Sequence, residues 1–596
     1  MQKIAVFIMF NYLRFRYRRQ IRLAQRRLSK LKRNYTIYTD RHIRGKWSQL
    51  RLIRRFVIAW SIVIVVATLG VVGQIRGLNQ RARIVTPRPG GILRESEVGT
   101  VKNLNPILPE NSISADINRL IFSGLTQHNA KRQIVPDLAS SWDISPDGKT
   151  YTFHLRHNIS WHDGVAFGAQ DVVFTLAAIQ NPDSRSPLAG SWQGVKAEAK
   201  GDDTVIFTLP NPLTSFLDST SVGILPRHII ESIDPSSLRE NGFNQHPIGT
   251  GPFKIKTFAP AANEVSLEPN IRYYDGRPRL DGYEFDLFAT KQEAINAYAN
   301  RRVDAVGNVT PESIRATENL KDFKSYDYKL PDVVTVFFKT DDALLADKSL
   351  RQILSGAIDR KKIIQKADMG IGLGINQPIL PGEHGYTTAF AIPEKSITAS
   401  KTALDEAGWK LSDGIRMKDG KKLKLNLVTL RGGELERAAV ELKMQWREIG
   451  IDLIIKAVPL DELEQSYIRT RQYQLLLFGI NVGGDPDVYA FWHSSQIKDP
   501  GLNLSNYNSP DADRALEAGR IKTDSLIRKG KYQAFLKAWN ADAPGIILYE
   551  PIYRYGISAS AKGFESGSLV EPNDRFYNVQ NWTILTEEVA RYHLKT

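Results

Sequence analysis

Cysteine is absent from all 596 residues of the chain. Without thiols the protein forms no disulfides, holds no metal through thiolates and has no cysteine nucleophile. A lipid anchor on cysteine is excluded for the same reason. Common enzyme signatures are missing as well: H-E-x-x-H, G-x-S-x-G, a Walker loop and G-x-G-x-x-G do not occur. We therefore predict no catalytic residue, no metal site and no cofactor.

Acidic residues are nearly absent from residues 1–55, which hold 17 Lys and Arg but only one acid, Asp40. The whole chain has 80 basic and 64 acidic residues, so residues 56–596 hold 63 of each sign. The net charge of +16 therefore belongs to the short N-terminal segment. An overall basic chain would favour nucleic-acid binding, but this large neutral part does not.

Charged residues are also missing from residues 56–73, and the uncharged run continues to Ile75. A helix of this length is ~30 Å long, about the thickness of a bilayer's hydrocarbon core. We predict a transmembrane helix at 56–75, a basic cytoplasmic segment at 1–55 and a linker at 76–90. The positive-inside rule places the N-terminus in the cytoplasm and the large body outside, as a single-pass protein of the cell membrane. A cleaved signal peptide is the rival interpretation, but the run is long for one and lies deep in the chain.

The basic segment has a helical pattern of its own. Apolar residues at 17, 21, 24, 28 and 31 recur at helical spacing among Lys and Arg. This pattern suits a helix that lies on the anionic inner leaflet of the membrane. An equally weighted interpretation is that the charge only orients the protein during insertion.

Strands and helices alternate after Gly91. The segment YTFHLR at 151–156 alternates apolar and polar residues as a strand does. Asp171 opens a predicted helix, and apolar residues spaced through 435–449 mark another. Gly450 is a helix stop, and 451–455 is predicted to be a buried strand. This order is typical of α/β layers, and the chain is long enough for more than one lobe.

Residues 135–176 carry a long sequence block, VPDLASSWDISPDGKTYTFHLRHNISWHDGVAFGAQDVVFTL. This block resembles the signature region of family 5 extracellular solute-binding proteins, the dipeptide-, oligopeptide- and nickel-binding receptors of ABC importers. Shorter matches lie before and after it, in family order across about 90–585: LNP, FSGL, PIGTGPF, SLRQILSGAIDRKKI, ALDEAGW, DPD and APGIILY. We interpret the two glycines of PIGTGPF, at 247–253, as positions that need unusual backbone dihedrals.

The resemblance implies an α/β fold with two lobes, of the periplasmic-binding-protein type II class that contains the large peptide receptors. A two-segment hinge joins the lobes, and the cleft between them closes over the ligand. We predict lobe I at 91–335 with a subdomain near 129–243, lobe II at 336–555, and a return to lobe I at 556–596. Family members are often held by a lipid on cysteine, so here the helix at 56–75 is the expected tether.

The resemblance also suggests where the ligand binds. Peptide receptors of this family capture the peptide's amino group with a carboxylate before the D-P pair. That acid is missing here, and Asn481 or Gly483 falls nearest. Asp485, in the DPD element, has mainly a structural interpretation. With a first-lobe strand as the second wall, the cleft candidates are Gly99, Thr100, Val101, Ile480, Asn481, Val482, Gly483 and Asp485.

We predict a membrane-tethered, monomeric receptor that captures di- or oligopeptides and delivers them to the permease subunits of an ABC importer. It is expected to bind no nucleic acid and to have no enzymatic activity. Two alternatives stay open. One is a tethered sensor or chaperone on the same scaffold, which the long basic arm would serve. The other is a receptor for a non-peptide solute such as a metal chelate.

Overall fold

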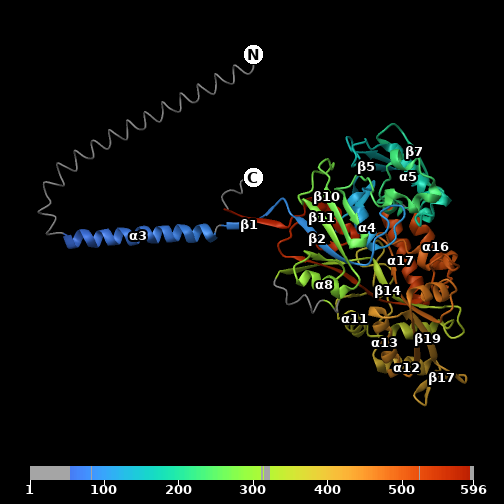
Figure 1. Cartoon of the computed structure of the whole chain (residues 1–596). Coiled ribbons are helices and arrows are strands. Elements are labelled where there is room, and N and C mark those ends of the chain that lie inside the picture. The colour runs from blue at the N-terminus through green and yellow to red at the C-terminus, as the bar shows by residue number, and fades with distance from the viewer. Residues whose placement is uncertain (1–53, 82, 311–312, 314–321, 522–523, 591–596) are drawn as a thin grey trace, which may run out of the picture. The chain divides into compact units, whose positions relative to one another are not determined.

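The computed structural model of the chain describes residues 54–81, 83–310, 313, 322–521 and 524–590. The chain divides into two compact units, Met1–Thr86 with Glu587–Thr596, and Pro87–Thr586. The large unit has a mixed α/β fold (Figure 1). The basic helix predicted around residues 17–33 lies outside the described residues.

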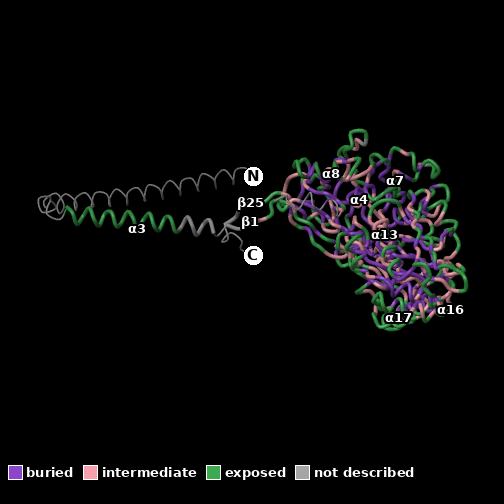
Figure 2. Tube along the Cα trace, turned by 90° about the horizontal axis from the view of Figure 1, so that it is seen from below, coloured by how far each residue is buried: buried purple, intermediate pink, exposed green. Residues whose placement is uncertain are grey.

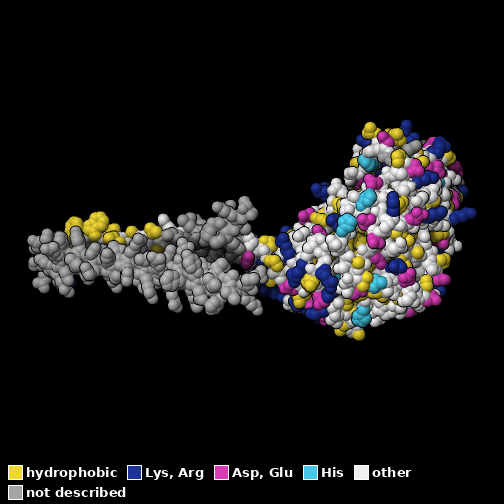
Figure 3. Space-filling view, turned by 90° about the horizontal axis from the view of Figure 1, so that it is seen from above, with side chains coloured by type: hydrophobic (Ala, Val, Ile, Leu, Met, Phe, Trp, Pro, Cys, Tyr) yellow, Lys and Arg dark blue, Asp and Glu magenta, His cyan; other side chains and the backbone are white. Residues whose placement is uncertain are grey.

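The small unit contains a long apolar helix, α3 (Arg54–Arg81). By length and composition its stretch Arg54–Gln74 can cross a membrane, and none of that stretch is buried by protein (Figure 2). Phe56, Trp60 and Leu69 are 69%, 61% and 65% exposed, a surface that water solvates poorly. Figure 3 shows hydrophobic side chains along the described part of this helix. The helix thus has the length and the surface of one membrane span.

The segment after α3 is more ordered than a linker. α3 continues to Arg81, and strand β1 (Arg83–Arg88) pairs with β25 (Leu585–Ala590) in a two-stranded sheet. The hydroxyl of Thr86 donates a hydrogen bond to the carbonyl oxygen of Glu587 at 3.3 Å. The two residues are 501 positions apart, so a reading of the local sequence could not reveal this pairing.

Lobe I is built on an eight-stranded sheet that uses both ends of the large unit (Figure 1). In order across the sheet, its strands are β24 (Gly567–Ser568), β13 (Phe323–Lys329), β23 (Ile552–Ser558), β12 (Ala305–Val306), β2 (Ile92–Val98), β11 (Gly282–Phe288), β10 (Glu264–Pro269) and β9 (Phe253–Ala259). Helix α4 (Ser112–Ile121) packs against β9, and α8 (Lys291–Ala299) packs against β2. The strand closest to the start of this unit therefore lies inside the sheet, near one of the last strands.

A four-stranded antiparallel sheet and helix α5 (Ala169–Gln180) form the subdomain of lobe I. Its strands are, in order, β5 (Ala139–Ile144), β6 (Thr150–Leu155), β8 (Thr204–Thr208) and β7 (Lys196–Ala199). Residues 151–155 of the YTFHLR segment lie in β6, as predicted, and the strand ends before Arg156. The helix begins two residues before Asp171, whose carboxylate accepts a hydrogen bond from the backbone N–H of Gly168 at 3.0 Å.

The PIGTGPF segment runs against the C-terminal end of α4. A Cβ at Gly249 would collide with the carbonyl oxygen of Ile121, and the N–H of Gly251 donates a hydrogen bond to the same oxygen at 2.8 Å. Neither glycine has a positive φ. The interpretation that these glycines provide unusual dihedrals is therefore wrong, and close contact between two backbones requires them.

Lobe II contains a six-stranded sheet with helices on its faces. Its strands are, in order, β15 (Leu373–Gly374), β22 (Gly545–Glu550), β14 (Asp332–Phe338), β21 (Leu475–Asn481), β19 (Lys424–Leu430) and β20 (Asp452–Val458). The predicted helix–glycine–strand unit is α13 (Gly433–Glu448), Gly450 and β20. The expectation that this strand is buried holds for one face only: Ile451 and Leu453 are 2% and 1% exposed, but β20 is an edge strand and Ile454 is 37% exposed.

Two chain crossings form the hinge between the lobes. Leu330 and Pro331 connect β13 of lobe I to β14 of lobe II, and Pro551 connects β22 back to β23. The crossings lie a few residues before the predicted boundaries at 335 and 555. Such short connections confine a lobe movement to a few backbone torsions, as a hinge requires.

Candidate functional site

The predicted second-lobe residues lie at the end of β21, beside the hinge. Asn481 is the last residue of β21 and pairs in antiparallel register with Asp332, the first residue of β14. The backbone N–H of Val482 donates a hydrogen bond to the carbonyl of hinge residue Pro331 at 2.8 Å. Ile480 and Val482 are buried in a core of lobe II. The strand end is thus held firmly against the hinge.

Asn481 also contacts lobe I. Its Oδ1 accepts a hydrogen bond from the N–H of Gly483 at 2.9 Å, which closes a turn with a φ of +82° at the glycine. Its Nδ2 donates to the carbonyl of Val570 in lobe I at 3.4 Å. Asp485 forms an ion pair with Arg528 inside lobe II. The acid nearest to the expected amino-group anchor is therefore already engaged by the protein.

The predicted first-lobe residues follow β2. Gly99 has a φ of +133° and its N–H donates to the carbonyl of Phe288 at 3.0 Å. Thr100 is exposed, and its carbonyl accepts a hydrogen bond from Asn111, the N-cap of α4, at 2.9 Å. Val101 is only 1% exposed and belongs to the core of lobe I. Gly99 and Thr100 are accessible, whereas protein encloses Val101.

The two lobes meet around Arg132 of lobe I. Its Nη2 lies 2.9 Å from Oε1 of Glu550, and its Nη1 lies 3.9 Å from Oε1 of Glu383. Burial raises the pKa of Glu383 to about 7, although the positive charge of Arg132 opposes this shift. Farther out, the N–H and the hydroxyl of Thr214 both donate to the carbonyl of Arg520 in lobe II at 3.3 Å. These contacts describe a closed arrangement of the lobes.

A cavity of about 620 Å³ lies between the lobes, next to the hinge. Its volume is typical of sites for small ligands. Two of its lining residues are next to predicted cleft residues: Val98 precedes Gly99 in the chain, and Asp332 pairs with Asn481. Five carboxyl groups and two cationic groups line it. The lining residues are Glu97, Val98, Ser112, Asp116, Lys291, Asn308, Val309, Thr310, Leu330, Asp332, Asp368, Gly433, Glu434, Arg437, Pro551, Ile552, Tyr553 and Pro572.

A buried ionic cluster forms the lobe I wall of this cavity. The guanidinium of Arg575 holds the two carboxylate oxygens of Asp116 at 3.0 and 2.7 Å and one oxygen of Glu95 at 2.8 Å. The other Glu95 oxygen accepts hydrogen bonds from the hydroxyls of Tyr283 and Tyr555. The side chains of Arg575 and Glu95 are completely buried. One cation thus balances two buried carboxylates.

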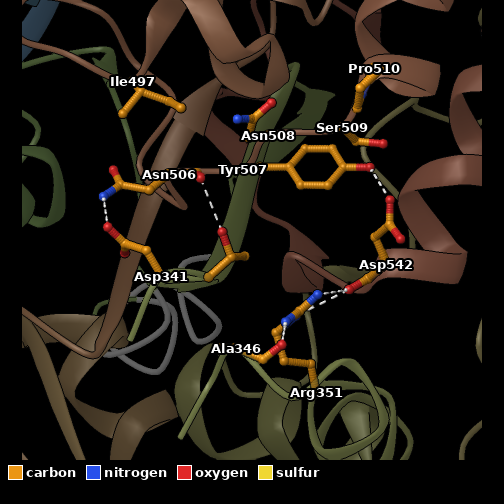
Figure 4. A pocket seen from close by; sticks show the side chains of 11 residues that line it. Asp341, Ala346, Arg351, Ile497, Asn506, Tyr507, Asn508, Ser509, Pro510 and Asp542 are labelled. Atoms are coloured by element: carbon orange, nitrogen blue, oxygen red, sulfur yellow. Dashed lines mark hydrogen bonds between the residues drawn. The ribbon is translucent and has the colours of Figure 1, made fainter. Parts of the chain in front are cut away.

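A second cavity, of about 560 Å³, lies within lobe II (Figure 4). Its polar groups bond to one another. Nδ2 of Asn506 donates to Asp341 at 3.0 Å, the hydroxyl of Tyr507 donates to Asp542 at 2.7 Å, and Arg351 donates to backbone carbonyls. Lobe I contributes nothing to its lining. These contacts stabilise lobe II, and the cavity between the lobes is the better candidate for ligand binding.

The model of one protein family, described as Bacterial extracellular solute-binding proteins, family 5 Middle, matches residues 133–501, more than half of the chain. The chain belongs to this family. A family 5 relative, the oligopeptide-binding protein AppA of Bacillus subtilis (strain 168), is 29% identical over 508 residues, which cover 83% of this chain and 92% of that protein. The dipeptide-binding protein of Escherichia coli (strain K12) is 22% identical over 494 residues and covers 78% and 90%.

Solved structures agree with this assignment. AppA of Bacillus subtilis in complex with a nonapeptide has a TM-score of 0.68 at 28% identity and covers 84% of this chain and 100% of its own. NikZ of Campylobacter jejuni in complex with Ni(L-His) has a TM-score of 0.69 at 27% identity and covers 83% and 99%. The predicted two-lobed fold and the resemblance to family 5 are confirmed. Membership in a family of solute-binding proteins also confirms that the chain is a binding protein and not an enzyme.

The local sequence does not reveal the acidic wall of the cavity. Glu95 and Glu97 stand in a strand written ILRESEV, where charged residues normally mark the solvent face. The one available signal was that two acids occupy the same face of the strand as Leu93, which is buried. Their counterion, Arg575, lies 480 positions from Glu95 in the sequence.

Proposed function

We propose that the chain is a membrane-tethered extracytoplasmic receptor that binds peptides between its lobes and delivers them to an ABC importer. The observation that carries this proposal is the cavity of about 620 Å³, lined by both lobes and by both hinge crossings, in a family 5 fold. The structure of AppA, 28% identical, contains a nonapeptide. An extended peptide suits such a site, because its backbone binds without regard to its side chains.

Four of the predicted cleft residues, Gly99, Thr100, Asn481 and Gly483, belong to this proposal as ligand contacts, whereas Val101, Ile480, Val482 and Asp485 are buried or engaged by the protein. Gly99 and Thr100 offer accessible backbone on the lobe I side. Asn481 and Gly483 offer a turn on the lobe II side, where the Asn481 amide already reaches lobe I. Closure would bring the two sides together around the ligand, and the closed shape is what a transporter would recognise.

Tethering to the membrane by α3 is part of the same proposal. The 17 basic residues and one acid of residues 1–55 favour a cytoplasmic N-terminus, and the exposed apolar surface of α3 favours a span. Protease added to intact cells is expected to degrade the body and to leave residues 1–55 protected. Protection of the body instead would contradict this topology. Light scattering of the detergent-purified protein tests the expectation of a monomer.

A non-peptide solute is the second candidate ligand, because the NikZ structure contains Ni(L-His) at 27% identity. Full-length protein, purified in mild detergent and then heat-denatured, should release its ligand for mass spectrometry. Peptides in the released fraction support the proposal. Libraries of di- to nonapeptides should raise the melting temperature of the protein. A peptide present at one hundred times its Kd is expected to add ~2.7 kcal/mol to the free energy of unfolding. If Ni(L-His) stabilises the protein and no peptide does, the ligand is a metal chelate and not a peptide.

A further inference from the structure

Glu97 is the carboxylate of the interlobe cavity that the protein itself does not use. It lies on β2, two residues from Glu95 and on the same face of the strand. It is 9% exposed and lines the cavity. Its carboxylate forms neither a hydrogen bond nor an ion pair with any residue in the described part of the chain. A buried carboxylate without a partner is unfavourable, so this arrangement favours a partner from outside the chain.

The neighbouring charges are already engaged. Arg575 is shared by Asp116 and Glu95, and carboxylate oxygens of Glu95, Glu97 and Asp116 all lie within 4.8 Å of one another. The nearby ammonium of Lys291 donates to the carbonyl of Gly307 at 2.7 Å and makes no ion pair with Glu97. Three carboxylates thus face two cations, and Glu97 is the one that neither cation pairs with directly, although the positive charges of Arg575 and Lys291 still act on it.

Gly307 keeps this position free for the carboxylate. A Cβ on Gly307 would collide with Oε1 of Glu97 and would lie 3.3 Å from the hydroxyl of Tyr553. The backbone just after β12 therefore lies directly against Glu97, which also lines the cavity. A positively charged ligand group would meet it there.

We propose that Glu97 binds a primary ammonium group of the ligand, and so replaces the acid that is missing before the Asp485–Pro486 pair. This inference rests on the proposed function, because it assumes a peptide in the cavity. The ammonium comes from the peptide's amino terminus or from a lysine side chain, which present the same chemistry. A carboxylate–ammonium contact in a buried site is a charge-assisted hydrogen bond and selects for the charged group.

Proton release is a consequence of this contact. Burial, together with the negative charges of Glu95 and Asp116, holds the pKa of Glu97 well above its usual range, while Arg575 and Lys291 oppose the shift. In the closed protein without ligand, Glu97 therefore tends to keep its proton. An incoming ammonium ion stabilises the carboxylate, and the proton leaves to the buffer.

The test uses full-length protein in detergent with a random nonapeptide library made without lysine, and the same library acetylated at the amino terminus. Binding is followed by calorimetry in two buffers of different ionisation enthalpy. The wild type should bind the unmodified library and release a proton. Glu97→Gln, which keeps the shape, should bind it roughly 10–100-fold more weakly and without proton release. Glu571→Gln, at an exposed carboxyl that does not line this cavity, is the control and should bind as the wild type does.

The outcomes separate the two proposals. If no library binds the wild type, the proposed function fails. If Glu97→Gln binds the unmodified library as tightly as the wild type, only the role of Glu97 is overturned. If an acetylated library whose peptides contain lysine binds more tightly than the acetylated library without lysine, and this increase is lost in Glu97→Gln, the ammonium group belongs to a lysine side chain. If Mg²⁺ or Ni²⁺ alone stabilises the wild type but not Glu97→Gln, the three carboxylates form a metal site, and the proposal that Glu97 binds an ammonium group is overturned. The unliganded variant should melt no lower than the wild type.

Discussion

Replacement of Arg575 by methionine is expected to destabilise lobe I strongly. The side chain is completely buried, and its guanidinium makes three contacts of 2.7–3.0 Å with Asp116 and Glu95. Removal of one partner from a buried ion pair costs about 3–5 kcal/mol, because the remaining charge has lost its counterion. Here two carboxylates lose the same cation. We therefore expect a loss of about 4 kcal/mol or more from the free energy of unfolding near neutral pH.

The loss should depend on pH. Burial already raises the pKa of Asp116, and without the opposing positive charge of Arg575 this pKa would rise further. A carboxyl group with a raised pKa in the folded state stabilises the fold at low pH, and this contribution disappears as the pH rises through the raised pKa. The variant should therefore lose less stability at pH 5 than at pH 8. Arg575→Met combined with Glu95→Gln and Asp116→Asn removes all three charges and should recover most of the loss.

Urea denaturation of the full-length protein in detergent measures these differences. Trp582 is a local reporter, since it is 1% exposed and its ring centroid lies 5.5 Å from that of Phe576, the neighbour of Arg575. A loss under about 1 kcal/mol at pH 8, or the same loss at pH 5 and pH 8, would refute the argument from buried charge. The triple variant is the control, because it has the same methionine without the unpaired acids.

Two further predictions concern the hinge side and the backbone contact in lobe I. Protonation of Glu383 (pKa about 7) favours the closed state, so closure without ligand should weaken as the pH rises from 5.5 to 8, and Glu383→Gln should remove this dependence. Because the chain has no cysteine, two introduced cysteines can carry dyes that report lobe distance by energy transfer. Gly249→Ala should destabilise by several kcal/mol, since its Cβ meets the carbonyl of Ile121. Gly530→Ala, in helix α17 (Ser525–Asp542) with free space around it, should stabilise by about 0.5–1 kcal/mol. Urea denaturation distinguishes the two, and equal effects would contradict the steric argument.

The sequence predicted the parts of the fold that depend on local pattern. Alternation at 151–156 predicted β6, and the helical spacing before Gly450 predicted α13 followed by β20. It did not reveal that β20 lies at an edge, because edge position depends on strand order. It also did not reveal the pairing of β1 with β25, which joins residues about 500 positions apart.

The predicted site residues stay a prediction. The resemblance placed the second wall at Ile480–Asp485, and this segment lies beside the hinge, where Asn481 pairs with the cavity residue Asp332, but none of its residues is among those that line the cavity. The acidic groups were not predictable, because Glu95 and Asp116 become interior residues only through Arg575. The sequence also did not show why position 249 requires glycine, since the close contact of its backbone with the backbone of Ile121 produces no recognisable sequence pattern.

The chain order of the two lobes has a consequence for how the protein is made. Lobe II is one continuous insertion, from Asp332 to Glu550, whereas β23 enters the middle of the lobe I sheet only afterwards. A chain that leaves the ribosome N-terminus first has all of lobe II before it has that strand. We expect lobe II to fold first and to bring together the ends of an insertion of about 220 residues, which lowers the entropy lost when β13 and β23 pair. Synthesis of the receptor thus finishes by completing the lobe with which it began.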